Sequence, residues 1–304
     1  MNKGYIKIAL ALLSVASYMQ NIVFAHNTIT NNKPSNEDDK YKAYFNPAGA
    51  KKLIEAKLAK QAKQAAGIST DALALVQKYA KHTKDYQPYS KEGEEPILYF
   101  KRVNNTDIGK LEFTLPNPDN YADVVSMIWD PNGAKHFDDT FIEGYFPEVY
   151  NENLAIVQHR YTSPIKSWPL FYHALASKVE LSEKKTVIFL VSSNITDCYY
   201  HFNKKYINPI VKSANSFQPY VDSEDDIRNG KLIKIYANLV GFIIEKEADC
   251  VKITYISSFN LDFSPGYPEH LARKVLADRI LKVIKLKDVF KGNKPISIWN
   301  LKKN

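Results

Sequence analysis

Hydrophobic and polar residues alternate through the centre of the chain, and this spacing is typical of β-strands. Between residues 171 and 181, Phe171, His173 and Leu175 share one side of an extended chain, and the residues between them share the other. The segments with this pattern are residues 154–161, 171–181 and 187–191. Because they follow one another closely, we expect them to form a meander of antiparallel strands.

Further segments on either side of this meander show the same alternation. They are residues 97–103, 111–115, 232–244 and 251–259. Residues 105–109 are predicted to form the turn between the first two, and residues 245–250 are predicted to join the last two as a hairpin. These segments extend the predicted sheet beyond the central meander.

Other segments repeat hydrophobic residues every three to four positions, as amphipathic helices do. An Ala/Lys-rich helix is predicted over residues 49–68, and Gly67 is expected to end it because glycine is favoured just beyond a helix C-terminus. A second helix is predicted after Ser69-Thr70-Asp71, which can cap it, and a third over residues 121–129. The last helix, residues 269–286, has an apolar face formed by Ala272, Val275, Leu276, Ile280, Val283 and Ile284.

This order of helices and strands predicts an α+β domain over residues 69–290, in which a curved antiparallel sheet wraps around the long C-terminal helix. A sheet curved over a helix leaves a hollow between the two. In the first strand of the meander, Val157, His159 and Tyr161 lie on one side, so that an aromatic and polar end continues an apolar face. Such a face suits an amphiphilic ligand.

The two ends of the chain differ from this domain in composition. Residues 1–25 contain two early lysines, an apolar run and the small-residue sequence Val23-Phe24-Ala25, and they are predicted to be a signal peptide. A membrane anchor is the alternative, but the apolar run is shorter than the ~20 residues that a helical span needs. Residues 26–48, rich in Asn, Lys, Asp and Ser, are predicted to be a disordered spacer, and residues 291–304 a basic tail.

Composition and charge limit the partners. At 304 residues and 45% hydrophobic content, the chain is long and apolar enough to bury a core. Its formal net charge of +8 comes from lysines interspersed with acids, which favours transient attraction to anionic membrane surfaces and argues against a nucleic-acid partner. We expect a monomer. Cys198 and Cys250 could pair in an oxidising compartment, and the sequence leaves open whether they do.

The sequence has no motif of a common catalytic or cofactor site. It lacks the G-x-S-x-G, G-x-x-x-x-G-K-[ST], G-x-G-x-x-G and H-E-x-x-H patterns, and its seven histidines are not grouped at the spacing of metal ligands. His136 and Asp138 could act as an acid and a base, but no nucleophile accompanies them. We therefore expect no enzyme activity, no cofactor and no metal.

The order of elements resembles that of the START (lipid-transfer) domain family over residues 70–290, near in pattern to phosphatidylcholine-transfer protein. Residues 130–138 are similar to the family's Asp-x-x-x-Arg-x-x-Trp-Asp turn, with Asp138 in the last acidic place. The arginine place is taken by Ala134, and Lys135 stands beside it. The resemblance implies a helix-grip fold with an internal lipid cavity that carries a phospholipid, with phosphatidylcholine expected, between membranes.

The resemblance also implies which residues bind the lipid. They are Lys135, Asp138, His159, Tyr161, Tyr172, Tyr236 and Asn238. The aromatic faces of Tyr161 and Tyr172 would hold a choline group, with Asp138 adding charge, and Lys135 would contact the phosphate. On the residues alone, the tyrosines are better explained as ordinary strand residues with half-buried rings, and Lys135 is equally well explained as a solvated surface residue.

The signal peptide, the spacer and the Lys-rich helix together resemble the Fam-a family of exported malaria-parasite proteins. Lys51-Lys-Leu-Ile-Glu55 loosely matches the export signal of such proteins, although the same residues also open the predicted helix. The resemblance implies secretion, followed by export to the parasitophorous vacuole or the host cell. The alternative function is an exported surface or host-interaction protein that keeps the fold without lipid transfer, which the missing arginine favours.

Overall fold

A computed structural model of the chain describes most of the residues from Pro47 onward. The described residues are 47–81, 84–89, 97–163, 169–197, 205–261 and 268–291. The chain divides into two units, Met1–Gly67 and Ile68–Asn304, and the described residues of the first are helical. The predicted signal peptide, nearly all of the predicted spacer and the predicted basic tail beyond Lys291 lie outside the described residues.

The first described element, α3, is one continuous helix, Pro47–Lys81. The predicted helix end near Gly67, with a new helix after Asp71, is therefore wrong. A glycine inside a helix costs only about 1 kcal/mol, and the buried stripe of the second half begins before the expected cap. Its members are Ile68, Ala72, Val76 and Tyr79. Packing of this stripe outweighs the local signals that end a helix.

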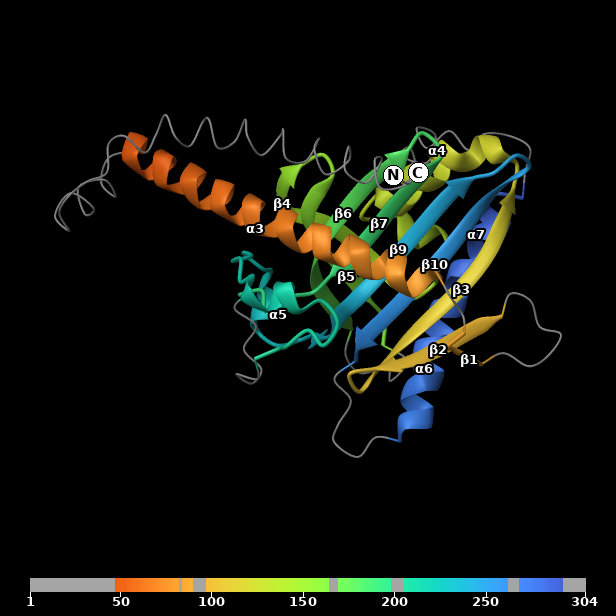
Figure 1. Cartoon of the computed structure of the whole chain (residues 1–304). Coiled ribbons are helices and arrows are strands. Elements are labelled where there is room, and N and C mark those ends of the chain that lie inside the picture. The colour runs from red at the N-terminus through yellow and green to blue at the C-terminus, as the bar shows by residue number, and fades with distance from the viewer. Residues whose placement is uncertain are drawn as a thin grey trace. The chain divides into compact units, whose positions relative to one another are not determined.

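Among the described residues, ten strands form one sheet (Figure 1). Their bounds are β1 Gln87–Pro88, β2 Leu98–Val103, β3 Thr106–Pro116, β4 Phe141–Asn151, β5 Leu154–Tyr161, β6 Leu170–Ser182, β7 Lys185–Val191, β8 Ile233–Lys234, β9 Tyr236–Lys246 and β10 Cys250–Asn260. The order across the sheet is β1-β2-β3-β10-β9-β7-β6-β5-β4, and β8 pairs in parallel with the start of β6. The other pairs are antiparallel, and the predicted meander of β5, β6 and β7 is confirmed.

Several strand boundaries differ from the prediction, and two of the differences have a clear structural cause. The turn between β2 and β3 consists of Asn104 and Asn105 rather than residues 105–109. Both asparagines have positive φ, 48° and 59°, as the tight turn of a two-residue hairpin requires. The predicted strand 232–244 is split at Ile235, because β8 pairs with β6 whereas β9 pairs with β7 and β10.

Strand β4 is not among the predicted strands. Its burial does not alternate regularly, and three register shifts interrupt its pairing with β5. Such irregularities break the two-residue period on which strand prediction depends. β4 forms an edge of the sheet, directly beside β5 and its predicted ligand-binding residues.

The remaining helices lie between strands or follow the last strand. Their bounds are α4 Tyr121–Trp129, α5 Asp225–Arg228, α6 Glu269–Leu281 and α7 Leu286–Val289, with the 3-10 helices η1 Pro118–Asn120, η2 Gly133–His136, η3 Lys212–Ser216 and η4 Lys282–Lys285. α4 agrees with its prediction, whereas the predicted last helix is interrupted by η4 and continues to Val289. In the described part of the chain, no helix combines the length and the apolar character needed to cross a membrane.

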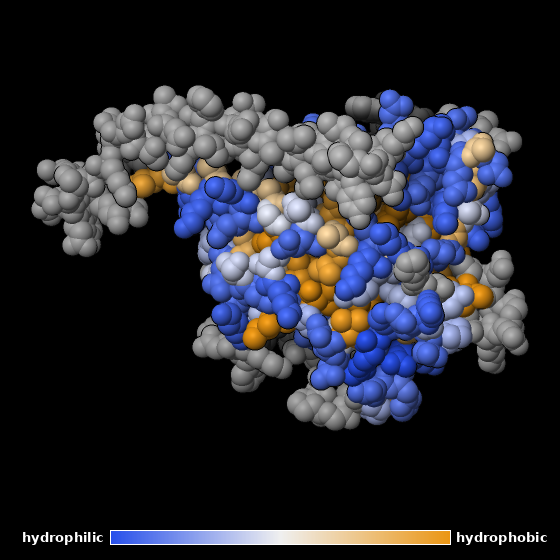
Figure 2. All heavy atoms as spheres, in the orientation of Figure 1, coloured by the Kyte–Doolittle hydropathy of each residue, from blue (hydrophilic) through white to orange (hydrophobic). Residues whose placement is uncertain are grey.

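Alternation along the strands gives the sheet two different faces. In β9, Val240 and Phe242 belong to the inner face, whose core includes residues of α4, α6 and α7. Gly241 belongs to the outer face, which the second half of α3 crosses (Figure 1). A Cβ at Gly241 would lie 2.8 Å from the methyl groups of Val76, so the glycine allows α3 to approach closely. Figure 2 views the molecule from this side, with hydrophobic atoms gathered near the centre and hydrophilic atoms around them.

The inner face holds the main hydrophobic core and the C-terminal helix. Gly109 of β3 allows α6 to approach the sheet, because a Cβ at this position would collide with the side chain of Ile280. α6 packs on β3 and β10, whereas toward β5 and β6 a cavity separates it from the sheet. The predicted α+β helix-grip architecture, a curved antiparallel sheet with a C-terminal helix on one face, is confirmed.

Candidate functional site

A cavity lies between the inner face of the sheet and α6, where the sequence predicted a hollow. Its volume is about 80 Å³, and its lining comes from α4, η2, β4 to β7, β9, β10, α6 and η4. Most of the lining is apolar or aromatic, as Trp129, Ile188 and Phe242 illustrate. Pockets that bind small molecules usually measure ~300–1,000 Å³, so in this conformation the cavity is too small for a lipid.

Three of the predicted ligand residues form a connected cluster at one end of the cavity. His159 and Tyr172 lie opposite each other on β5 and β6, and the Tyr172 hydroxyl is 2.8 Å from Nδ1 of His159. Tyr161, on the same face of β5, stacks on Tyr172 with the ring centroids 6.1 Å apart. Phe141 of β4 meets the rings of both β5 residues edge-on, each at 5.3 Å. All four side chains are buried.

Arg279 of α6, which is absent from the sequence-based set, enters this cluster. Its guanidinium carbon lies 4.0 Å from the centroid of the Tyr161 ring and 4.6 Å from that of Phe259. This is the geometry of a cation–π contact. The protein's own arginine therefore stands against a ring that the family resemblance assigned to a choline group.

The sequence contains a signal for Arg279. Ala272, Leu276 and Val283 belong to the predicted apolar face of the last helix, and Arg279 falls on the same face at helical spacing. Burying a charge is unfavourable unless a partner compensates it. A charged residue within an apolar stripe therefore indicates either a buried ion pair or a polar ligand.

Asp138 is buried at the same end of the cavity and is already paired. Its Oδ1 accepts hydrogen bonds from Lys282 Nζ at 2.9 Å, from the Thr140 backbone N–H at 2.9 Å and from Thr140 Oγ1 at 2.6 Å. The charge of Asp138 also acts on Arg279, but no carboxylate of the described residues forms an ion pair with Arg279. Asp138 is therefore shared between Lys282 and Arg279, and Lys282 bonds in addition to the exposed Asp139 at 2.7 Å.

The histidine and the tyrosines of the cluster are uncharged near pH 7. Burial, together with the positive charge of Arg279, lowers the pKa of His159 to about 3. Burial also raises the pKa of the Tyr161 hydroxyl, and it raises that of Tyr172 well above its ordinary value. The cluster therefore presents a neutral imidazole and two phenols beside one guanidinium.

The other three predicted ligand residues lie away from this cavity. Lys135 is exposed on η2, whereas Ala134, in the family's arginine place, lines the cavity. Tyr236 stacks on Tyr206 with the ring centroids 3.9 Å apart. Asn238 lines a separate open cleft of about 390 Å³. The pairing of β9 with β10 has a bulge at this point, which removes Asn238 from the alternation that the prediction assumed.

The described lining is mainly aromatic and aliphatic, with its charged side chains at Asp130, Asp138, Arg279 and Lys282. It includes no serine, threonine or cysteine that could act as a nucleophile. Elsewhere, Glu247, Asp249 and Cys250 form a trio of possible metal ligands at the exposed turn after β9, but exposed acidic groups of this kind are common without a metal. Cys250 is a free cysteine in the structure, and Cys198, its possible partner, lies outside the described residues.

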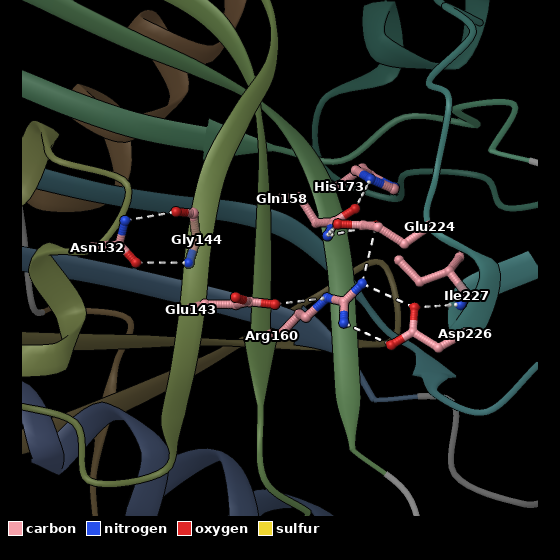
Figure 3. Close-up of polar contacts among 9 residues, drawn as sticks. All are labelled: Asn132, Glu143, Gly144, Gln158, Arg160, His173, Glu224, Asp226 and Ile227. Atoms are coloured by element: carbon pink, nitrogen blue, oxygen red, sulfur yellow. Dashed lines mark hydrogen bonds and ion pairs between the residues drawn. The ribbon is translucent and has the colours of Figure 1, made fainter.

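The outer face of β5 carries a second charged group, which is paired (Figure 3). Arg160 forms two hydrogen bonds with the carboxylate of Asp226, at 2.7 and 3.0 Å. Its guanidinium also contacts Glu224 at 3.0 Å and Glu143 at 3.5 Å. These contacts fasten α5 and the residue before it to β4 and β5.

A chain of buried hydrogen bonds continues from this group across β6. His173 contacts Gln158 Oε1 through Nε2 at 2.7 Å and Asp197 Oδ2 through Nδ1 at 3.0 Å. Lys234 of β8 donates to the same Asp197 oxygen at 2.5 Å. Burial lowers the pKa of His173, although Asp197 opposes this change. The network has its polar partners in place and lies outside the cavity, which indicates a structural role.

Comparisons with known proteins identify the fold. No family model matches the sequence, and a comparison with curated proteins found no match. Among solved structures, human StAR-related lipid transfer protein 5 matches with a TM-score of 0.54 and 10% sequence identity, over 75% of this chain and 97% of that chain. Human STARD10 matches with a TM-score of 0.52 and 13% identity, over 75% of this chain and 80% of that chain.

A third match is the lipid transfer and protein localization domain of human StarD13 (DLC2), with a TM-score of 0.50 and 12% identity, over 72% of this chain and 95% of that chain. At such low identity, the matches establish the fold and leave the ligand open. The arrangement of sheet, cavity and closing helix agrees with them. The chain therefore has the helix-grip fold of StAR-related lipid transfer domains.

Proposed function

We propose that this protein holds a lipid between the sheet and α6 and carries it between membranes. The observation that carries the proposal is the cavity, which is apolar along most of its lining and polar at the end where Arg279 lies. Such a lining fits an amphiphile, because acyl chains gain roughly 0.8 kcal/mol per CH₂ removed from water while the head group meets polar side chains. The shared fold of StAR-related lipid transfer domains supports this function.

Loading a lipid requires the cavity to widen. α6 forms the wall opposite the sheet, and its C-terminal end passes into the 3-10 helix Lys282–Lys285. A 3-10 stretch within a helix is a frequent hinge. In the proposed mechanism α6 tilts away from β5 and β6 about this hinge, and Arg279 leaves the ring of Tyr161 as the lipid enters.

Lipid transfer between vesicles tests this function. The purified chain is mixed with donor vesicles that contain labelled lipids of several head groups and with unlabelled acceptor vesicles. We expect transfer well above the rate without protein, and a bound lipid in the native mass spectrum of the reisolated protein. If the folded protein neither transfers nor retains any lipid, the proposal is wrong.

Two alanines of β6 provide matched variants for the same assay. Ala176 lines the cavity, whereas Ala174 is buried on the same face but lies outside the lining. Ala176→Leu should reduce lipid transfer because it takes up space in the cavity, and Ala174→Leu should not. Each overpacks the core at a cost of about 1–3 kcal/mol, so urea denaturation must first show that both are folded. Equal transfer by the two variants would place the lipid elsewhere.

Phosphatidylcholine is the cargo that the family resemblance predicts, with Tyr161 and Tyr172 around the choline group. For this ligand to bind as predicted, Arg279 would have to give up its contact with the Tyr161 ring. Competition between labelled phosphatidylcholine and other labelled lipids in the transfer assay measures the preference.

The place of action follows from the sequence resemblance alone. The predicted signal peptide would direct the chain into the secretory pathway, and the Fam-a resemblance adds export to the parasitophorous vacuole or the host cell. Imaging of the tagged chain in a producing cell tests both steps, and retention in the cytoplasm would contradict them.

The small cavity favours a second candidate function, that of an exported interaction protein that keeps the fold without carrying lipid. The cavity measures about 80 Å³, and the side chain of Arg279 already occupies the face of Tyr161. This function predicts no extractable lipid in the purified protein, and it predicts that Tyr172→Ala leaves binding of the protein partner unchanged. Native mass spectrometry therefore separates the two candidates.

A further inference from the structure

The aromatic cluster of the cavity already holds a cation. Arg279 approaches the ring of Tyr161 to 4.0 Å and that of Phe259 to 4.6 Å, within the range at which aromatic faces attract a positive charge. A quaternary ammonium would compete with this tethered guanidinium for the same rings, and it would add a second positive charge beside it. The cluster is poorly suited to a ligand whose charge at this point is positive.

The two acids and two bases of the described lining balance in formal charge, but neither acid forms an ion pair with Arg279. Among the described residues, the charged side chains of the lining are Asp130, Asp138, Arg279 and Lys282. Asp138 bonds to Lys282 at 2.9 Å, and Asp130 accepts a hydrogen bond from the Asn132 backbone N–H at 2.8 Å. Of the two acids, Asp138 acts on Arg279 and also bonds to Lys282, and Lys282 bonds in turn to Asp139 at 2.7 Å.

Arg279 also has the right geometry for an oxyanion. A guanidinium presents five N–H donors in a planar fork, which matches the oxygens of a carboxylate or a phosphate. Hydrogen bonds between a guanidinium and such an anion are roughly twice as strong as neutral ones. The Tyr161 hydroxyl lies within hydrogen-bond reach of Arg279 and Tyr172, and 3.4 Å from His159 Nδ1, so an anion bound at Arg279 would also meet this hydroxyl.

We propose that Arg279 receives the anionic group of the cargo, so that the cavity selects amphiphiles with a phosphate or carboxylate head group that no ammonium group neutralises. The inference rests on the proposed function, since it names the class of lipid held in the same cavity. On entry, the anion replaces the aromatic rings as the partner of the guanidinium, while Lys282 keeps Asp138 neutralised. The acyl chains then follow the apolar lining away from this end.

Competition between two lipids with the same acyl chains tests the proposal. The full chain is incubated with vesicles that contain phosphatidic acid and phosphatidylcholine in equal amounts, at about 0.5 M salt to screen attraction between exposed charges and the vesicle surface. The protein is then reisolated, and its bound lipid is quantified by mass spectrometry. We expect phosphatidic acid to exceed phosphatidylcholine about tenfold, as one charge-assisted interaction worth ~1.4 kcal/mol would produce.

Variants of α6 test whether Arg279 causes the preference for phosphatidic acid. Arg279→Gln should bring the two bound lipids to nearly equal amounts, and Arg279→Lys, which keeps the charge but loses the fork, should give an intermediate ratio. Lys274→Gln is the matched control, because it removes a positive charge from an exposed position of the same helix. It should retain the wild-type ratio. Circular dichroism checks that each variant is folded.

The possible failures are distinguishable. If phosphatidylcholine predominates, or if Arg279→Gln leaves the ratio unchanged, the head-group inference is wrong while the proposed lipid carriage stands. If no lipid of either kind is retained, the proposed function itself is wrong. If inorganic phosphate raises the Tm of the wild type but not of Arg279→Gln, and no lipid is retained, the site takes a soluble anion and both lipid proposals are wrong.

Discussion

The inner and outer faces of the sheet each hold an arginine beside β5, and the two arginines have different surroundings. Arg160 contacts three carboxylates on the outer face and holds α5 in place (Figure 3). Arg279 reaches the inner face from α6 and contacts two aromatic rings, but no carboxylate of the described residues pairs with it. A charged side chain that is already ion-paired within the protein needs no ligand. A charged side chain without an ion-pair partner can instead bind a ligand of opposite charge. The contrast separates a structural network from a binding site.

Two buried histidines repeat the contrast. His173 on the outer face contacts Asp197 and Gln158 through its two ring nitrogens. His159 on the inner face contacts the hydroxyl of Tyr172, and burial lowers its pKa to about 3. The outer face therefore supplies an acid for its histidine, and the inner face does not.

Removal of the outer acid should have the largest effect on stability. Asp197 is only 3% exposed and bonds to both His173 and Lys234. Breaking a buried ion pair costs about 3–5 kcal/mol, so we expect Asp197→Asn to lower the free energy of unfolding by about 3 kcal/mol in urea denaturation. Asp222→Asn, at an exposed acid paired with Arg228, is the control and should change it by less than about 0.5 kcal/mol. Equal midpoints for the two variants would show that the outer network is not structural.

Acidification should have the next largest effect on the free energy of unfolding, because His159 is buried as a neutral group. Between its ordinary pKa of 6.5 and its folded pKa of about 3, the unfolded chain binds a proton that the folded chain does not. The free energy of unfolding should therefore fall as the pH falls through this range, by about 2 kcal/mol between pH 7 and pH 5 from this residue alone. Denaturation at both pH values measures the loss.

Two variants show which histidine causes this pH dependence of stability. His159→Gln should remove most of it. His173→Gln should remove less, because Asp197 partly offsets the effect of burial on the pKa of His173. If the loss between pH 7 and pH 5 is the same in the wild type and in His159→Gln, the inner histidine is not buried as a neutral group.

Arg160→Gln should have a moderate effect on stability. The variant loses two hydrogen bonds to Asp226 and the contact with Glu224. Both acids are partly exposed and can be solvated by water, so we expect a loss of about 1.5 kcal/mol in the free energy of unfolding. The amount of bound lipid should not change, because Arg160 lies outside the cavity lining. Loss of lipid without loss of stability would reverse the roles assigned to the two faces.

Arg279→Gln should have the smallest effect on stability. The variant loses cation–π contacts worth about 0.5–2 kcal/mol, but it also removes an incompletely compensated charge from an apolar site. We expect these terms to offset each other to within about 0.5 kcal/mol in urea denaturation. If Arg279→Gln destabilises the protein more than Arg160→Gln does, Arg279 is structural and the comparison of the two faces fails.

Part of the candidate site could be predicted from local sequence. The two-residue period of β5 places His159 and Tyr161 on one face, and the pairing of β5 with β6 brings Tyr172 beside them. Asp138, at the end of the family-like turn, lines the same cavity. Local patterns suffice here because each residue is placed by its own strand or turn.

Lys135, Tyr236 and Asn238 show where this approach fails. Lys135 follows Ala134 in a 3-10 helix, where neighbouring residues point in different directions. Ala134 therefore lines the cavity, whereas the side chain of Lys135 is exposed. Tyr236 and Asn238 lie near the split between β8 and β9 and the bulge in the pairing with β10. A bulge shifts the face on which every later side chain lies, and it depends on the partner strand, which a single segment of sequence does not specify.

The sequence by itself determined most of the strands, the helices α4 and α6, and the apolar face of each, because these follow from backbone periods that act over a few residues. The continuity of α3, the irregular edge strand β4 and the size of the cavity depend on how elements far apart in the chain pack together. The same holds for Arg279, whose partner Tyr161 lies on another element more than a hundred residues earlier. Only the tertiary structure, which brings α6 across β5, decided that the aromatic cluster would surround a cation of the protein itself.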